Sequence, residues 1–163
     1  HISTGDLFRF NIQHGTDLGK LAQSFIDQGD LVPDSVTINM LEAEVDKHPE
    51  AKGFIFDGFP RTTDQAKALD EFLGKKQMPI TATIALEADD DRLVERLLQR
   101  GQTSGRTDDQ DEEKIRNRFQ EYNLKTAPLR SYYEAQNKFH SIDGIGTIEE
   151  ITDRLTAVID HFL

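Results

Sequence analysis

An acid, a glycine and an arginine follow a short apolar run near the middle of the chain, within the segment Asp-Gly-Phe-Pro-Arg at residues 57–61. The apolar run at residues 54–56 predicts a strand buried on both faces, as in a parallel sheet covered by helices. Open α/β sheets bind ligands beyond the carboxyl ends of their strands. There Asp57 could hold Mg²⁺ and Arg61 could bind phosphate, as a phosphoryl-transfer site requires. The alternative is a plain turn at Asp57 and Gly58, and these residues alone leave both interpretations open.

Three further arginines lie near glycines at the expected ends of elements: Arg9, Arg100 and Arg106. Glycine lets the backbone approach a ligand closely, and a guanidinium group binds phosphate through two parallel hydrogen bonds. These arginines are therefore candidates for an anion site. Arginines on helix surfaces have a simpler interpretation as solvated residues whose ion pairs contribute about 0–1 kcal/mol. That interpretation is applied to Arg92, Arg116, Arg130 and Arg154.

The sequence offers few other reactive arrangements. The histidines show no metal-ligand spacing, and no serine and histidine pattern predicts a nucleophile. Residues 15–20 read Gly-Thr-Asp-Leu-Gly-Lys and imitate a phosphate-binding loop. They have three residues between the glycines where four are required, and Leu21 stands where Ser or Thr would bind Mg²⁺. The segment is therefore not expected to bind phosphate.

Composition indicates one globular domain. The chain of 163 residues is long enough for a well-filled core, with 36% hydrophobic and 30% charged residues. The formal net charge of -11 argues against a nucleic-acid-binding surface, because such surfaces are basic. No segment approaches the ~20 apolar residues that span a bilayer, so no membrane contact is expected. The absence of cysteine excludes disulfides and thiolate metal sites, and it fits a cytoplasmic protein.

Strands alternate with helices along the chain, which predicts an α/β fold with a parallel sheet. Further strands are expected at residues 80–86 and 139–142. The first fifty residues hold mainly short helices, and Asp34 is expected to cap one of them. Thr62 and Gln65 have the spacing of a capping box at the start of the next helix.

The second half of the chain predicts three longer helices. Asp89 is expected to cap the first of these, and one face of that helix carries Arg92, Arg96 and Arg100. A short loop is expected at residues 101–105. On the next helix, the side chains of Ile115, Phe119 and Tyr122 are expected to face the core. The last helix has a capping box at residues 147–150. Its expected core positions are Ile148, Ile151, Leu155, Val158, Ile159 and Phe162.

Taken together, these segments resemble the adenylate kinases of the nucleoside monophosphate kinase family. The matching pieces occur in family order across nearly the whole chain: residues 2–9, residues 31–33, residues 57–61, Gln65, Arg96, Arg100, residues 104–106, Asp108, Asp109, Arg118 and residues 126–129. The resemblance implies a single domain over residues 1–163, with a three-layer parallel sheet of the P-loop nucleoside triphosphate hydrolase type. It also implies a small helical AMP-binding insert at about residues 3–32 and a short lid at about residues 99–109.

By the same resemblance, the reaction is the reversible Mg²⁺-dependent transfer of the terminal phosphoryl group of ATP to AMP, giving two ADP. The implied AMP-binding residues are Thr4, Arg9, Val32, Gly58, Arg61, Gln65, Arg106 and Arg118. The implied ATP-binding residues are Arg96, Arg100 and Gly146. The implied catalytic residues are Asp57, Arg61, Arg100, Arg106 and Arg118. Asp57, together with Asp6, would position Mg²⁺ through water. Arginines suit this reaction because they stabilise a transferring phosphoryl group without a proton transfer.

Two residues favour AMP as the phosphoryl acceptor. Gln65 would recognise the adenine base, since pyrimidine-selecting relatives carry asparagine in this segment, although it also fits the reciprocal half of a capping box with Thr62. Thr4 favours AMP because pyrimidine-selecting relatives often have alanine there. A UMP or CMP kinase, and a non-catalytic nucleotide-binding module, remain the alternatives. The five residues 101–105 resemble the lid of the short-lid subclass, which binds no zinc, and a monomer is expected.

The phosphate loop of the family has no counterpart in this sequence. By the resemblance, a strand, a glycine-rich loop and a lysine that cradle the ATP phosphates would precede His1. That strand would lie in the middle of the sheet, so its absence would expose apolar edges on both flanking strands. We therefore expect the 163 residues to be a portion of a longer protein, and expect them alone to fold poorly and form no measurable ADP.

Overall fold

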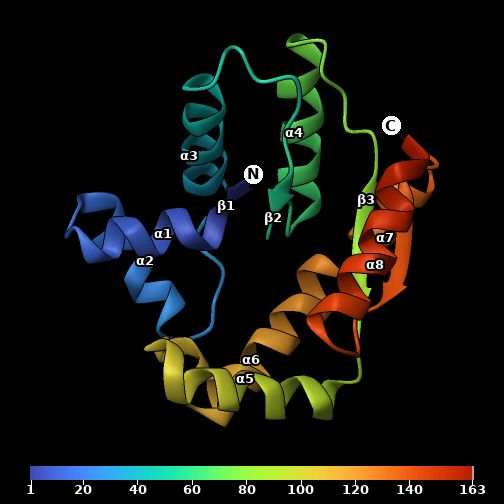
Figure 1. Ribbon diagram of the computed structural model, residues 1–163. Coiled ribbons are helices and arrows are strands. Elements are labelled where there is room, and N and C mark those ends of the chain that lie inside the picture. Colours follow the sequence, from blue (N-terminus) through green and yellow to red (C-terminus); the bar gives the residue numbers. More distant parts are fainter. Residues whose placement is uncertain (163) are drawn as a thin grey trace.

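The computed structural model describes residues 1–162, except for the side chain of Thr107, and shows a mostly helical α/β fold (Figure 1). The first half of the chain contains β1 (Ile2–Ser3), α1 (Thr4–Gln13), α2 (Asp17–Ile26), α3 (Asp34–Asp46), β2 (Phe56–Asp57) and α4 (Thr63–Lys75). The second half contains β3 (Thr83–Glu87), α5 (Asp90–Ser104), η1 (Thr107–Asp109), α6 (Glu112–Glu121), η2 (Tyr122–Thr126), α7 (Leu129–Glu134), β4 (Phe139–Asp143), α8 (Ile148–Ile159) and η3 (Asp160–Phe162).

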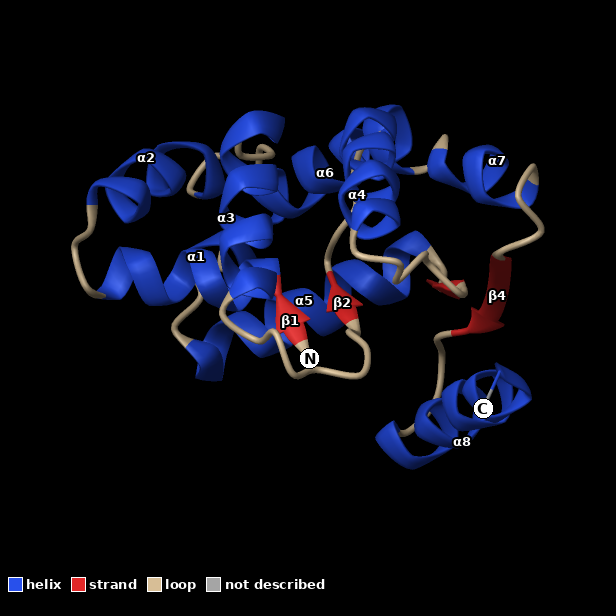
Figure 2. Ribbon diagram, turned by 90° about the horizontal axis from the view of Figure 1, so that it is seen from above, coloured by secondary structure: helices blue, strands red, loops and turns tan. Residues whose placement is uncertain are grey.

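The strands form two separate parallel pairs. In the first pair Ile2 of β1 lies opposite Phe56 of β2. In the second pair the register runs from Thr83 opposite Phe139 to Glu87 opposite Asp143. Figure 2 shows β1 beside β2, with β4 at a distance from both. The parallel pairing of strands joined by helical crossovers confirms the predicted α/β class.

The strands are more exposed than the sequence predicts. The strand expected at residues 54–56 is only the pair Phe56–Asp57, and Ile55 is 62% exposed. The strand expected at residues 80–86 begins at Thr83, and Leu86 is 51% exposed. The prediction of burial on both faces was wrong for these two segments, because no element among residues 1–162 covers the side chains of Ile55 and Leu86. The strand expected at residues 139–142 is confirmed as β4.

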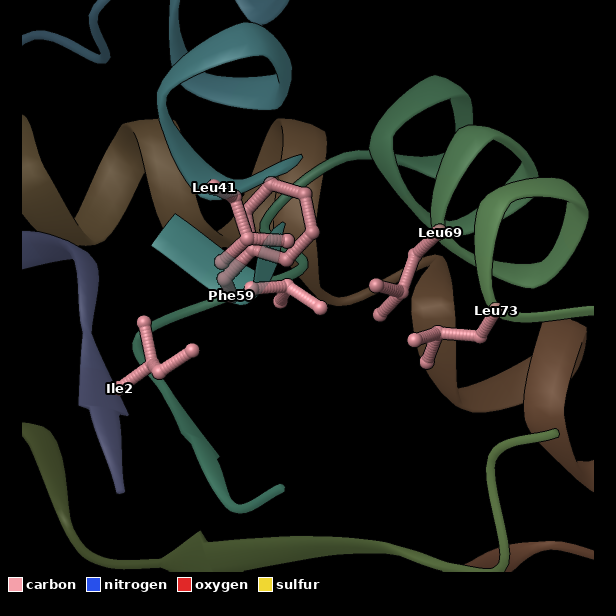
Figure 3. Close-up of a cluster of buried hydrophobic side chains, with 6 residues drawn as sticks. Ile2, Leu41, Phe59, Leu69 and Leu73 are labelled. Atoms are coloured by element: carbon pink, nitrogen blue, oxygen red, sulfur yellow. The ribbon is translucent and has the colours of Figure 1, made fainter. Parts of the chain in front are cut away.

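The main hydrophobic cluster holds the loop that follows β2. Figure 3 shows side chains from β1, α3, α4 and this loop meeting in one place. The buried members are Ile2, Leu41, Val45, Phe59, Leu69 and Leu73. Phe59 lies between Asp57 and Arg61, and burying a side chain of this size stabilises the fold by about 1.5–3 kcal/mol. The loop that carries the candidate chemistry is therefore anchored at its centre.

A smaller cluster joins the two halves of the chain. Ala66 of α4 packs against Leu129 and Tyr133 of α7, and all three are buried. Next to them, the hydroxyl of Tyr132 donates a hydrogen bond to Asp70 Oδ2 at 2.7 Å. These contacts fix the position of α4, which follows the β2 loop, relative to the elements that follow α6.

The helix starts and ends confirm some predictions and correct others. Thr62, Asp89 and Thr147 cap their helices as predicted. Asp34 does not cap α3, because the helix begins at Asp34 itself and its carboxylate bonds to other residues. The loop predicted at residues 101–105 was also wrong, since α5 continues to Ser104. Gly101 has a structural reason there: a Cβ would lie 2.3 Å from the carbonyl oxygen of Asp109.

Several predicted core positions are exposed. Tyr122 is 50% exposed, and on α8 Ile148 is 78% exposed, Ile159 36% and Phe162 of η3 39%. Ile151 is buried as predicted, because α8 packs on β4 through that face. The pattern of α8 predicts an apolar surface wider than the one that β4 covers. Within residues 1–162, no helix has the length and hydropathy needed to cross a membrane.

Candidate active site

The loop after β2 brings three of the predicted site residues together. Gly58 has φ +71°, in the left-handed region that favours glycine. A Cβ on Gly58 would lie 3.0 Å from Arg61 Nη2 and 3.3 Å from Thr4 Oγ1. The Gly58 carbonyl accepts hydrogen bonds from Arg61 Nε at 2.8 Å and from Thr4 Oγ1 at 3.0 Å. A side chain at this position would therefore displace Arg61 or Thr4.

The backbone of Arg61 is held by two side chains. Thr126 Oγ1 donates to the Arg61 carbonyl at 2.8 Å, and the Arg61 N–H donates to Gln65 Oε1 at 2.7 Å. Thr126 belongs to a stretch that matches the family, but the sequence alone assigned it no role. These two hydrogen bonds fix the backbone of Arg61, and therefore the position from which its side chain extends.

The guanidinium of Arg61 lies among like charges. Desolvation lowers its pKa, and the positive charges of Arg118, Arg106 and Arg9 lower it further, whereas Asp57 acts in the opposite direction. An arginine stays protonated throughout the physiological range. Arg61 is half-buried and makes no ion pair with a carboxylate of residues 1–162. An anion placed beside it would relieve both the desolvation and the repulsion.

A second group of arginines gathers on two carboxylates. Asp109 is fully buried, with Oδ2 2.6 Å from Arg100 Nε and Oδ1 2.6 Å from Arg118 Nη1. Arg106 Nε lies 3.4 Å from the same Oδ2. Asp108 Oδ2 lies 3.1 Å from Arg106 Nη2 and 2.9 Å from Arg118 Nη1. The two acids therefore hold three arginines in one place: Arg100 from α5, Arg106 from the loop between α5 and η1, and Arg118 from α6.

Charge pairing in this group outweighs desolvation. Burial raises the pKa of Asp108, but the hydrogen bond from Arg106 and the charge of Arg118 lower it overall. Burial lowers the pKa of Arg106, but Asp108, Asp109 and Asp6 raise it overall. The sequence matched Asp108 and Asp109 to the family without assigning them a role. The two adjacent acids that follow Arg106 after a single residue were the sequence signal that could have revealed this role.

The remaining arginine of the group comes from α1. Arg9 pairs with Asp6 on the same helix, and its guanidinium lies over Gly5, where a Cβ would be 3.1 Å from Arg9 Nη1. Arg9 is also one of the charges that lower the pKa of Arg61. The pKa of Asp6 itself is lowered, chiefly by the hydrogen bond from Arg9. The structure thus places five arginines as successive neighbours: Arg9, Arg61, Arg100, Arg106 and Arg118.

Other predicted residues lie outside this group. Arg96 is exposed on α5 and forms no ion pair with the described residues. Gly146 lies in the loop between β4 and α8, close to Glu150 and Arg154. Val32 is buried in a cluster with Phe8 and Ala22, which leaves its backbone as the part that could meet a ligand.

Gln65 is buried, and both the oxygen and the nitrogen of its carboxamide form a hydrogen bond within the protein. Its Nε2 donates to Asp34 Oδ1 at 2.8 Å, and its Oε1 accepts from the Arg61 N–H. Its backbone N–H donates to Thr62 Oγ1 at 3.1 Å, which is half of a capping box. The reciprocal half does not form, because the side chain bonds to Arg61 instead of Thr62. The capping-box interpretation of the Gln65 side chain was therefore wrong.

The carboxylates near the five arginines suit a Mg²⁺ ion that is held mainly by the phosphates of the nucleotide. Among residues 1–162, no group of three or more histidine, aspartate or glutamate side chains could hold a metal ion. Mg²⁺ in phosphoryl-transfer sites keeps several waters and is bound by one or two carboxylates together with substrate phosphates. The exposed Asp57 carboxylate at the end of β2 fits that role. Asp6 fits it less well, because Arg9 occupies its carboxylate.

Comparison with known proteins identifies the family. The adenylate kinase family model matches residues 1–138. The adenylate kinase of Flavobacterium psychrophilum is 69% identical over 161 residues, which cover 99% of this chain and 85% of that protein. The adenylate kinase of Flavobacterium johnsoniae is 66% identical with the same coverage, and that of Bacteroides fragilis is 43% identical over 160 residues, or 98% and 84%. The chain therefore belongs to the adenylate kinase family, whose reaction converts ATP and AMP to two ADP.

Proposed function

We propose that the five neighbouring arginines bind the phosphates of the two nucleotides in this reaction. Arg9 and Arg61 bind the phosphate of AMP, while Arg106 and Arg118 bind the phosphoryl group in transfer. Arg100, together with Arg96, binds on the ATP side. The observation that carries this proposal is the unpaired guanidinium of Arg61, half-buried among three like charges. A phosphate would supply the missing counter-charge, and each charge-assisted contact contributes about 1.5–3 kcal/mol.

The two acids keep the other arginines ready for this step. Arg100 uses its Nε on Asp109, and Arg118 uses Nη1 on both acids. A guanidinium has five N–H donors, so each of these arginines keeps donors for a phosphate. An oxygen of the AMP phosphate attacks the terminal phosphorus of ATP, and the bond from that phosphorus to the bridging oxygen of ADP breaks. The arginines stabilise the charge on the transferred group, and no proton needs to move.

Mg²⁺ accompanies ATP in this family and neutralises charge on the phosphates when it is bound. We propose that Asp57 holds it through water, with Asp6 as a second carboxylate. On the AMP side, the nucleoside would meet Thr4, the Val32 backbone, Gly58 and Gln65. The contacts of Thr4 and Gly58 with each other and with Arg61 support this assignment.

We also propose the finer architecture that the family implies. Residues 1–163 would form one domain with a three-layer parallel sheet of the P-loop type, a helical AMP-binding insert at about residues 3–32 and a short lid at about residues 99–109. The packing of α1 against α2 supports the helical insert, and the arginine at the end of α5 supports the lid. We propose a monomer in the cytoplasm, because all five arginines come from one chain and no cysteine is present.

Selectivity for AMP is the first expected result. In a coupled assay of the natural enzyme that carries these residues, kcat/KM for AMP is expected to exceed that for UMP or CMP by about 10²-fold or more. The reason is that a site built to hydrogen-bond one base leaves buried polar groups unpaired with another. Comparable values for UMP would make it a pyrimidine nucleotide kinase. Binding of AMP by calorimetry without ATP binding or turnover would instead show a non-catalytic module.

The isolated polypeptide of residues 1–163 is expected to form no measurable ADP. Its sequence contains no Gly-x-x-x-x-Gly-Lys segment to cradle the ATP phosphates, and its strands form two unjoined pairs. The measurement is ADP formation from ATP and AMP, with circular dichroism as the check on folding. Robust ADP formation by this polypeptide would contradict the expectation.

A further inference from the structure

The carboxamide of Gln65 has a fixed orientation. Asp34 Oδ1 accepts from Gln65 Nε2 at 2.8 Å, and Asp34 Oδ2 accepts from Thr62 Oγ1 at 2.7 Å. On its other side, Gln65 Oε1 accepts from the Arg61 N–H at 2.7 Å. The carboxylate is thus held by Thr62 while it holds Gln65, and it comes from α3, thirty-one residues away in sequence.

The chemistry of the partners dictates which end of the amide points where. A carboxylate only accepts hydrogen bonds and a backbone N–H only donates. A Gln65 amide turned by 180° would place Oε1 against Asp34 and Nε2 against the Arg61 N–H, so both hydrogen bonds would be lost. Gln65 is 2% exposed, so water would not replace them.

The remaining hydrogen-bonding capacity of Gln65 matches one class of purine. A primary amide has two N–H donors and two acceptor sites, and the protein uses one of each. Because the amide cannot turn over, the free N–H and the free acceptor site of Gln65 stay in fixed positions relative to the base. A 6-aminopurine offers an acceptor at N1 and a donor at N6, whereas a 6-oxopurine offers a donor at N1 and an acceptor at O6. Pairing with both purines would require both orientations of the amide.

We propose that Asp34 is a specificity-positioning residue, which fixes the Gln65 amide in the orientation that selects 6-aminopurine over 6-oxopurine nucleoside monophosphates. This inference rests on the proposed contact between Gln65 and the base. Asp34 does not itself touch the nucleotide. Because the Arg61 N–H also holds Gln65, removing the Asp34 charge weakens the selection without abolishing it.

The test compares AMP with inosine monophosphate, which differs in the 6-substituent and the proton at N1. Steady-state kcat/KM is measured for both nucleotides in the natural enzyme that carries this sequence and in its Asp34→Asn variant. The asparagine amide can turn to donate to Gln65 Oε1, so it accepts both orientations of Gln65. The ratio of kcat/KM for AMP to that for inosine monophosphate is expected to fall about tenfold, mainly through a gain for inosine monophosphate.

Controls separate this inference from the proposed function. Asp64→Asn removes an exposed first-turn carboxylate from α4 and is expected to leave the ratio unchanged. Equal losses for both nucleotides in Asp34→Asn would overturn the inference and show that Asp34 only supports the fold. An unchanged ratio in Gln65→Ala would overturn base recognition by Gln65, and the role of Asp34 with it. If Asp34→Asn does not fold, Asp34→Ser carries the same comparison.

Discussion

Replacing Arg118 by alanine is expected to lower kcat about 10³-fold, the effect typical of removing an arginine that binds a transferring phosphoryl group. Arg118 Nη1 lies 2.9 Å from Asp108 Oδ2 and 2.6 Å from Asp109 Oδ1. Among the neighbouring charges, that of Arg118 has the largest effect on the pKa of Arg61. It therefore links the acid-bound arginines to the one without a counter-ion. Since its contribution is made mainly in the transition state, the KM values are expected to change far less than kcat.

The matched control for this prediction is Arg116→Ala. Arg116 lies on the same helix, is more than half exposed, and among residues 1–162 forms an ion pair with Glu112 alone. Its loss is expected to leave kcat within about twofold, as for most surface ion pairs. Steady-state kinetics at saturating AMP and ATP measure both variants, and thermal unfolding shows whether they fold. A kcat for Arg118→Ala close to that of Arg116→Ala would remove Arg118 from the catalytic site.

Local structural features near the candidate site were predictable from the sequence. Local rules were enough for the helix caps at Thr62, Asp89 and Thr147, because a cap needs only the residues three positions ahead. Glycine beside arginine was also informative. Gly58 leaves room for Arg61 and Thr4, and this is a steric requirement that a sequence can carry.

The failures share a physical cause, which is that they depend on partners distant in sequence. The apolar residues 54–56 and 80–86 predict buried strands, yet burial depends on which elements cover them, and Ile55 and Leu86 remain exposed. Aspartate often caps helices, which is why Asp34 was expected to do so. Its carboxylate instead accepts a hydrogen bond from Gln65, and no local pattern predicts that contact. Asp109 likewise gains its meaning only when α5, η1 and α6 meet.

Replacing Arg61 by alanine is expected to lower kcat/KM for AMP about 10³-fold, with KM for AMP raised, kcat reduced and KM for ATP changed little. The Arg61 guanidinium is the one among the five neighbours without a carboxylate partner in residues 1–162, so it depends most on the nucleotide phosphate for its counter-charge. Arg61→Lys is expected to restore little. Lysine keeps the charge but cannot reproduce the planar fork that bonds to the Gly58 carbonyl through Nε and presents further donors to a phosphate.

Thermal unfolding distinguishes this role from a structural one. In the absence of nucleotide, burial and the charges of Arg118, Arg106 and Arg9 lower the pKa of Arg61, so its positive charge destabilises the free protein. Arg61→Ala is therefore expected to hold or raise the melting temperature while AMP turnover collapses. Arg130→Ala is the control, because Arg130 is exposed and pairs with Glu87 and Glu134. A melting temperature that falls with activity would make Arg61 a support of the fold. Unchanged AMP kinetics in Arg61→Ala would show that Arg61 does not bind the nucleotide phosphate. A residue that binds this phosphate at a cost in stability would change AMP binding when it is removed.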